Sequence, residues 1–309
     1  MYRLGIDLGG TNIAVGVVDQ SNQIVYKDSV KTPQGATQEV VTDAMVAICK
    51  QIMTDRGLNT TDIRYIGIGV PGIADDAAGK VIYAPNVHFD NFDLRGYFTK
   101  QLDVPVYMEN DANAAALGES LLPHMSAYKN VVFVTLGTGV GVGVTLNNQL
   151  IRGNVEAGHI TIDPSGPICG CGNAGCFESF SSATALIKRA KEKAGEHPES
   201  KLLALAGGVI DNIEAKTVFD AYDAGDACAI ELFDDYISYL AIGINNLLNS
   251  YPADAVILGG GVSKQEDKLI QPLTAKLQKL ALGGTLNAKI FTAKLGNDAG
   301  ILGAANLNG

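Results

Sequence analysis

The chain has 309 residues, of which 47% are apolar and 18% charged, and its formal net charge is −10. This composition is typical of globular domains and excludes a disordered chain, and the length suits one large domain or two of ordinary size. A strongly acidic surface repels phosphate backbones, so we expect no nucleic-acid partner. No secretory signal and no apolar run long enough to cross a membrane is visible, so we expect a cytoplasmic protein without a membrane partner.

Short apolar strands and amphipathic helices alternate through the first part of the chain. The spacing of Val41, Met45, Ile48 and Ile52 is that of one helix face. We predict strands at 2–8, 13–18, 23–29, 65–70 and 104–108, and helices at 38–55 and 112–120.

A strand, a glycine turn and a second strand open the chain, and the same pattern returns at 130–146. Aligning Asp7 with Thr135 superposes Gly9 on Gly137. Two copies of one β-unit indicate two related lobes with a ligand-binding cleft between them. The rest is mainly helical, with helices predicted at 182–193, 215–224 and 227–249, a strand at 255–258 before Gly259–Gly261 and a helix, and a closing helix at 298–307.

The two glycine turns are candidate phosphate loops. Glycine lets the backbone approach phosphate oxygens and point several N–H groups at them. Either turn alone would suit an ordinary hairpin, but two at matching positions favour a nucleotide. Asp7 adds a carboxylate for the water shell of a magnesium ion, and Thr135 does not. The candidate phosphate-binding residues are Asp7, Gly9, Gly10, Thr11, Asn12, Gly137, Thr138 and Gly139.

The segment Glu109-Asn110-Asp111 lies where a predicted strand ends and a helix begins. Side chains at that edge of a sheet commonly face ligands. Simple helix capping by Asp111 is one interpretation. The other is a general base that removes a proton from an attacking hydroxyl in phosphoryl transfer.

Three of the five cysteines fall within eight residues, and His159 lies shortly before them. His159, Cys169, Cys171 and Cys176 match the ligand set of a closed, structural zinc site. The alternative is three unpaired buried thiols and a core histidine. Glu156 and Glu178 flank this cluster, and carboxylates are good acceptors for sugar hydroxyls.

Together these motifs resemble the ROK family (repressors, open reading frames, kinases), and they are similar to the bacterial ROK glucokinases over essentially the whole chain. The resemblance implies an α/β, two-lobed, ribonuclease-H-like fold of the actin/hexokinase type with a central cleft and a structural zinc knuckle. It implies ATP, magnesium and zinc as cofactors and a hexose as the small-molecule partner. Glucose is the hexose that the resemblance favours. It also implies a homodimer or homotetramer.

The resemblance assigns roles to individual residues. Asp111 would be the catalytic base, and His159 would serve both zinc and sugar. The adenosine would lie over Gly259, Gly260 and Gly261. The sugar would be lined by Gly72, Asn86, Asn110, Asp111, Glu156, His159 and Glu178.

Two lobes and three rival functions complete the expectations. We expect a small lobe of residues 1–112 plus 297–309 and a large lobe of residues 113–296 with the zinc site.

The nearest rival function is the same chemistry on N-acetylglucosamine, N-acetylmannosamine, fructose, mannose or allose. A non-catalytic, sugar-responsive regulator is less favoured because the DNA-binding extension of the repressor branch is absent before Asp7. An actin-like ATPase would not need the Glu/His/Cys cluster.

Overall fold

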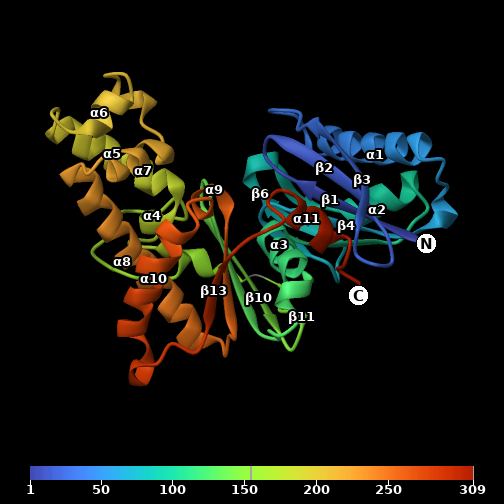
Figure 1. Ribbon diagram of the computed structural model, residues 1–309. Helices are drawn as coiled ribbons and strands as arrows, with labels where there is room; N and C mark the ends of the chain where they lie inside the picture. The colour runs from blue at the N-terminus through green and yellow to red at the C-terminus, as the bar shows by residue number, and fades with distance from the viewer. Residues whose placement is uncertain (154, 309) are drawn as a thin grey trace. The chain divides into compact units, whose positions relative to one another are not determined.

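Two five-stranded sheets organise the computed structural model, which describes residues 1–153 and 155–308 (Figure 1). The first has the strand order β3-β2-β1-β4-β8 and the second β11-β10-β9-β12-β13. In each sheet the first three strands lie side by side in chain order, and the two later strands follow beside the first of them. This shared order confirms the predicted internal repeat. The strands are β1 (Tyr2–Leu8), β2 (Asn12–Val18), β3 (Ile24–Lys31), β4 (Ile63–Val70), β8 (Val106–Asn110), β9 (Val131–Leu136), β10 (Val140–Leu146), β11 (Gln149–Leu150), β12 (Ala255–Gly259) and β13 (Lys289–Thr292).

The first sheet brings the polar ends of three strands to one edge. β1 runs parallel to β4, and β4 runs parallel to β8. In this register Asp7 lies beside Gly69, and Gly69 lies beside Glu109. The carboxyl ends of parallel strands are where α/β proteins present functional side chains.

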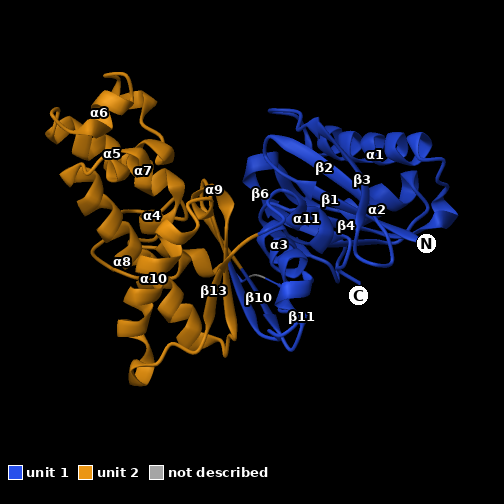
Figure 2. Cartoon of the chain, viewed as in Figure 1, with its two compact units in different colours: residues 1–133, 143–155, 294–309 blue, residues 134–142, 156–293 orange. Residues whose placement is uncertain are grey.

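Contacts divide the chain into two compact units (Figure 2). Unit 1 comprises residues 1–133, 143–155 and 294–309, and unit 2 comprises residues 134–142 and 156–293. The small and large lobes expected from the sequence stay a prediction. Two residues of these expected lobes, Asn154 and Gly309, lie outside the part of the chain that the structure describes.

Unit 1 carries the first sheet, four helices and a small sheet that the sequence analysis did not predict. The helices are α1 (Gln38–Asp55), α2 (Leu94–Gln101), α3 (Asp111–Ser120) and α11 (Asp298–Ala304). The small sheet has the order β5-β6-β7, with β5 (Ile73–Asp75), β6 (Lys80–Ala84) and β7 (Phe89–Phe92).

Unit 2 carries the remaining helices. They are α4 (Phe177–Ser181), α5 (Ala183–Glu196), α6 (Lys201–Leu205), α7 (Ala215–Asp223), α8 (Ala227–Ser250), α9 (Gly260–Ser263) and α10 (Asp267–Leu280). Among the described residues no helix combines the length and apolarity needed to cross a bilayer.

The last helix, α11, packs back onto the first sheet and α3 (Figure 1). Glycines on both partners make this possible. A Cβ built on Gly67 of β4 would lie 1.7 Å from the Ala304 carbonyl oxygen, and one on Gly303 would lie 1.6 Å from the Ala114 carbonyl oxygen. Backbone therefore packs directly on backbone. The predicted helix at 298–307 is too long, because the chain tightens after Ala304 into i→i+3 hydrogen bonds such as Asn306 N–H to Gly303 O at 2.8 Å.

Candidate functional site

The first glycine turn joins β1 to β2 and is fixed by its own backbone. Gly9 N–H donates to Asn12 O at 2.9 Å, and the Thr32 hydroxyl of the segment after β3 donates to Gly9 O at 2.7 Å. A Cβ on Gly10 would meet Asn86 at 3.9 Å. The predicted phosphate turn and the predicted sugar residue Asn86 therefore lie against each other within unit 1.

Asn110, not Asp111, caps helix α3. The Asn110 side-chain oxygen accepts Ala112 N–H at 2.8 Å and Asn113 N–H at 3.2 Å, and its amide group donates to Gly72 O at 3.0 Å. The helix therefore has its N-cap one residue before Asp111, which is the first helical residue. Asp111 Oδ1 also accepts Ala112 N–H at 2.8 Å, so both side chains contact the first turn of the helix, while the N-cap position belongs to Asn110.

Asp7 and Asp111 lie close enough to influence each other's charge. Burial raises the pKa of Asp7 to about 7, and the neighbouring Asp111 carboxylate adds to the rise. Asp7 also packs on α11, because a Cβ on Gly300 would lie 2.6 Å from its carboxyl carbon. A pair of partly buried carboxylates at one sheet edge is a typical environment for a cation or for proton transfer.

We expect the substitution Asp7→Asn to stabilise the ligand-free protein more at pH 8 than at pH 5. The folded-state pKa of about 7 lies above the ordinary value of 3.8, so ionising Asp7 costs more in the folded state, and stability is lost as pH rises between these values. Allowing for solvent screening of this half-buried group, the gain at pH 8 should be about 1–2 kcal/mol. Thermal denaturation at both pH values measures it.

The control for this prediction is Asp28→Asn, an exposed aspartate on β3. It reports what removing one negative charge from an acidic protein does by itself. Equal loss of stability by Asp7→Asn at pH 5 and pH 8 would contradict the assigned cost of ionisation.

Glu109 and Asn113 form a buried pair beneath the start of α3. Asn113 donates from its amide nitrogen to the Glu109 carboxylate at 3.1 Å and to Gly153 O at 3.3 Å. Burial raises the pKa of Glu109, and the hydrogen bonds from Asn113 and from Asn110 N–H oppose that rise. The sequence analysis gave no role to either residue. The pair ties the strand that ends at Asn110 to the loop before Glu156.

The second glycine turn joins β9 to β10. Gly137 N–H donates to Gly139 O at 3.1 Å, and Ala183 N–H donates to Gly137 O at 2.8 Å. A Cβ on Gly137 would meet nothing within 4 Å. The turn is thus held at its carbonyls and open above Gly137, as a phosphate cradle requires.

Gly260 packs against this second turn, whereas Gly261 is open. A Cβ on Gly260 would lie 2.4 Å from Leu136 O, and its φ of +81° favours glycine. Gly261 has no atom near its built Cβ. Of the three glycines assigned to adenosine, Gly260 therefore holds β12 against the phosphate turn.

The predicted metal ligands converge. The donor atoms of His159, Cys169, Cys171 and Cys176 all lie within 4.8 Å of one another. Cys169 Sγ is 3.5 Å from His159 Nδ1, and Cys171 Sγ is 3.6 Å from Cys176 Sγ. Ligands at the corners of a tetrahedron about 2.3 Å from zinc are separated by about 3.7 Å, so these two spacings fit zinc.

Tight turns bring these ligands together. Gly172 and Gly175 have positive φ, and a Cβ on Gly175 would lie 1.5 Å from Asp163 O.

Because His159 presents Nδ1 to the thiols, its Nε2 is directed elsewhere. Burial raises the pKa of Cys169 to about 12, whereas the Asn173 N–H lowers that of exposed Cys171.

Glu178 lies between the metal-ligand cluster and the second glycine turn. Its Oε1 accepts from Cys169 Sγ at 3.4 Å, and its Oε2 accepts Val140 N–H at 3.0 Å. The sequence identified Glu178 but gave no sign of Val140. Glu156 ends its segment at the short 3-10 turn Ala157–His159, where its carbonyl accepts His159 N–H at 3.0 Å.

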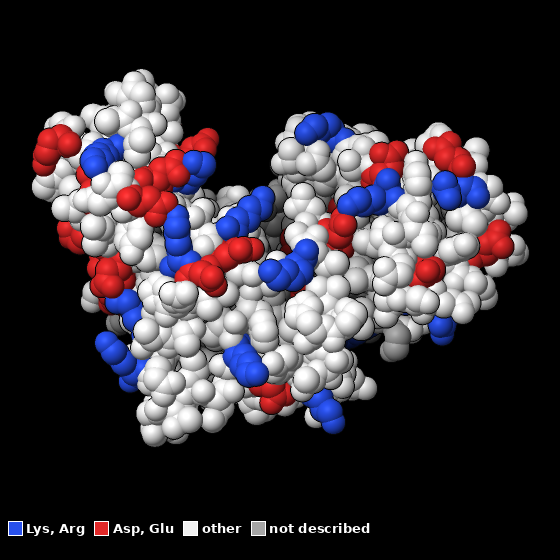
Figure 3. All heavy atoms as spheres, viewed as in Figure 1, with Lys and Arg blue, Asp and Glu red and all other residues white. Residues whose placement is uncertain are grey.

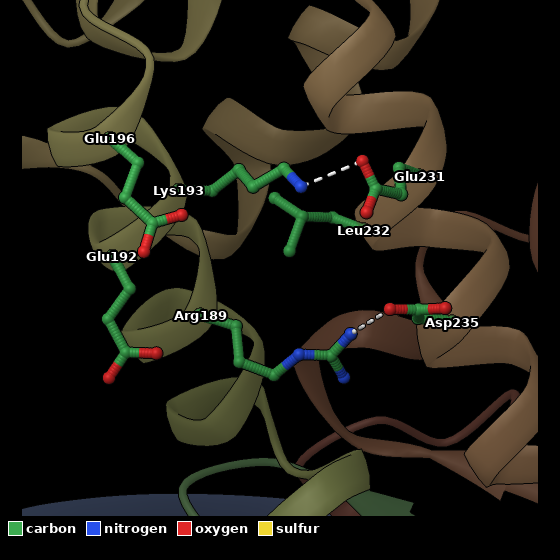
Figure 4. A pocket seen from close by; sticks show the side chains of 7 residues that line it. All are labelled: Arg189, Glu192, Lys193, Glu196, Glu231, Leu232 and Asp235. Atoms are coloured by element: carbon green, nitrogen blue, oxygen red, sulfur yellow. Dashed lines mark hydrogen bonds and ion pairs between the residues drawn. The ribbon is translucent and has the colours of Figure 1, made fainter.

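A pocket between α5 and α8 is of a different kind (Figure 4). Lys193 pairs with Glu231 at 2.7 Å, and Arg189 pairs with Asp235 at 3.1 Å. The other lining residues are Glu192, Glu196 and the apolar Leu232, and none of the predicted site residues lines this pocket. Acidic and basic side chains are similarly interspersed on the face of the molecule shown in Figure 3.

Known proteins resemble the chain over almost its full length. A profile of the ROK family matches residues 3–308. The chain belongs to the ROK family. The predicted family is thereby confirmed.

Relatives within the ROK family include enzymes and regulators. A glucokinase of Streptomyces coelicolor is 35% identical over 312 residues, which cover 98% of this chain and 96% of that protein. A xylose repressor of Bacillus subtilis is 29% identical over 311 residues, which cover 99% of this chain and 76% of the repressor.

A solved ROK structure has the same fold. The crystal structure of a ROK family glucokinase from Streptomyces griseus in complex with glucose and AMPPNP is 35% identical, covers 99% of both chains and gives a TM-score of 0.82. This match, together with the converging His/Cys cluster, confirms the predicted α/β fold class.

Proposed function

We propose that this ROK protein is an ATP-dependent hexose kinase and that glucose is its preferred substrate. The observation that carries the proposal is the placement of Asp111, which starts α3 at the sheet edge of Asp7 while Asn110 serves as the cap. The similarity to ROK glucokinases supports the reaction, and glucose is the sugar named with the Streptomyces griseus structure.

The sugar is assigned to the residues that the family resemblance named, because they present hydrogen-bonding groups. In this proposal the carboxylates and amides of the set accept and donate to ring hydroxyls, and the Nε2 of His159 adds a further partner. The set is Gly72, Asn86, Asn110, Asp111, Glu156, His159 and Glu178.

ATP is assigned to the two glycine turns and to Gly259, Gly260 and Gly261. The open space above Gly137 and the backbone N–H groups of both turns suit phosphate oxygens. The partly buried carboxylate of Asp7 suits the hydrated magnesium ion that accompanies ATP, and this ion would neutralise charge on the phosphates.

In the proposed mechanism Asp111 orients the sugar 6-hydroxyl and accepts its proton as the oxygen attacks the γ-phosphorus. The transition state of phosphoryl transfer is loose, so a carboxylate held in line is sufficient as the base. Backbone N–H groups of the turns stabilise the negative charge that develops on the transferred group. Exclusion of water directs the phosphate to the sugar.

Zinc is proposed for the His159/Cys169/Cys171/Cys176 cluster as a structural ion. Four protein ligands leave no open position for catalysis, and the ion would hold the segment between Glu156 and Glu178. Homodimeric or homotetrameric assembly, cytoplasmic location and the absence of nucleic-acid partners stay predictions.

The substitution Cys171→Ser should lower both zinc content and thermal stability. We expect about one zinc per chain in the purified protein and a clear loss in the variant, because a thiolate is one of four ligands. The melting temperature should fall by at least about 5 °C. Metal analysis and thermal denaturation measure the two effects.

Cys228→Ser is the matched control, because Cys228 lies on α8 outside the cluster. It should keep its zinc. Full zinc content in Cys171→Ser would show that the cluster is not the site of the ion.

A panel of sugars with ADP release as the readout tests the proposed function. Glucose should give the highest kcat/KM among glucose, N-acetylglucosamine, N-acetylmannosamine, fructose, mannose and allose. A different best substrate would correct the sugar and keep the kinase. The similarity to xylose repressors makes a non-catalytic, sugar-responsive regulator the second candidate. No ADP release with any sugar would favour this regulator. ADP release without formation of a sugar phosphate would favour an ATPase.

A further inference from the structure

The carboxylate of Glu178 joins two motifs that are far apart in the sequence. One oxygen lies 3.4 Å from Cys169 Sγ and accepts from it while that thiol is protonated, and the other accepts Val140 N–H at the end of the second glycine turn. A zinc-bound Cys169 is a thiolate and donates nothing, so in the metal-loaded protein Glu178 is connected to the cluster by its place two residues after Cys176. Glu178 is the second residue of α4, so its backbone position is set by the helix that follows Cys176.

Gly139 is shaped around this carboxylate. A Cβ built on Gly139 would lie 2.3 Å from Glu178 Oε2, closer than any side chain allows. A Cβ at this position would therefore displace the flexible end of the Glu178 side chain from its bond with Val140 N–H. Without Glu178 the turn would lose the acceptor that fixes its last N–H.

A second contact joins the same two motifs. A Cβ on Gly158, the residue before His159, would lie 1.9 Å from Val140 O. The backbone of Val140 is thus contacted on both sides by residues close to metal ligands. Glu178 accepts its N–H, and Gly158 packs against its carbonyl oxygen.

We propose that Glu178 is a positioning residue that ties the metal-binding cluster to the second glycine turn, so that an intact cluster sets the affinity for nucleotide phosphate. The inference rests on the proposed function, which assigns ATP to this turn. A turn held in one conformation before binding loses less conformational freedom when phosphate arrives, and its affinity is correspondingly higher.

Charge and positioning make opposite predictions here. A carboxylate near phosphate repels it, so removing the charge alone would strengthen nucleotide binding. Removing the acceptor would instead release Val140 N–H and weaken binding. Glu178→Gln removes the charge and keeps an acceptor, and Glu178→Ala removes both.

The experiment measures ADP binding by calorimetry without sugar and without magnesium, in protein loaded with zinc. Glu178→Ala should bind ADP roughly tenfold more weakly than the unsubstituted protein, and Glu178→Gln should bind within about twofold of it. Removal of zinc by a chelator should reproduce the loss. Unchanged or tighter binding in Glu178→Ala would overturn the proposal.

Hydrogen exchange of residues 136–143 gives a readout that needs no nucleotide. Exchange should be faster in Glu178→Ala and after zinc removal, and unchanged exchange in both would overturn the proposal. If the unsubstituted protein binds no ADP, the proposed function fails, while the exchange measurement still decides the link. If Glu178→Ala does not fold, the chelation arm decides it.

A double-variant cycle tests the contact at Gly139. Gly139→Ala should weaken ADP binding in the presence of Glu178, and the same substitution should cost less in Glu178→Ala, where the clash is gone. Strictly additive losses would show that position 139 acts on phosphate alone and would count against the link.

Discussion

The substitution Asp111→Asn should lower kcat for sugar phosphorylation by a factor of roughly a hundred to ten thousand. Asparagine keeps the shape of the side chain and its place at the start of α3 but cannot accept the proton of the 6-hydroxyl. The cap at Asn110 is untouched, so the helix should stay intact. Steady-state kinetics with glucose and ATP measure the loss.

Two further measurements separate chemistry from structure. Calorimetry with glucose should show sugar affinity within a few-fold of the unsubstituted protein, because an amide still bonds a hydroxyl. The control Asp93→Asn makes the same change at the N-cap of α2, where asparagine caps as well as aspartate does. Near-normal turnover in Asp111→Asn would refute the base.

The substitution Gly67→Ala should destabilise the protein by about 3 kcal/mol or more. The added methyl would lie 1.7 Å from the Ala304 carbonyl oxygen, and backbone cannot rotate away as a side chain can. Helix α11 must then move off the sheet, and Gly300, which packs on Asp7, moves with it. We expect activity to fall together with stability. Denaturant unfolding measures the free energy.

The control is Gly195→Ala in α5, where the nearest atom is the Ile210 side chain at 3.9 Å from the built Cβ. Alanine has a higher helix propensity than glycine, so this variant should be as stable as the unsubstituted protein or more stable by up to about 1 kcal/mol. Equal stability of the two variants would contradict the close packing of α11.

Periodicity predicted the long elements well, because their apolar spacing is set by local packing. Helix α1 spans Gln38–Asp55, as predicted, and α8 spans Ala227–Ser250 against a predicted 227–249. Strands β5, β6 and β7 were missed although each pairs with its neighbour along the chain, since three to five residues carry too little alternation.

The candidate site shows the same division. The four metal ligands were predicted from spacing alone, because their partners lie within 18 residues of one another in the chain, from His159 to Cys176. The contact of Glu178 with Val140 and that of Asp7 with Gly300 join distant segments, so no local pattern indicates them. Helix α3 begins at Asp111 behind an asparagine cap, and both Asn110 and Asp111 suit that position equally well by residue type.

The dependence of the first sheet on α11 has a consequence for synthesis at the ribosome. β1 and β4 are made first, and helix α11, which covers them, is made only after residues 134–293. Until then the glycine-lined face of the sheet lacks its partner, although residues 134–293 contain all of unit 2, which can fold in the meantime. Such long-range closure slows folding. We therefore expect the nascent chain to bind chaperones until α11 emerges, and a stop codon before residue 298 to leave unit 1 prone to aggregation.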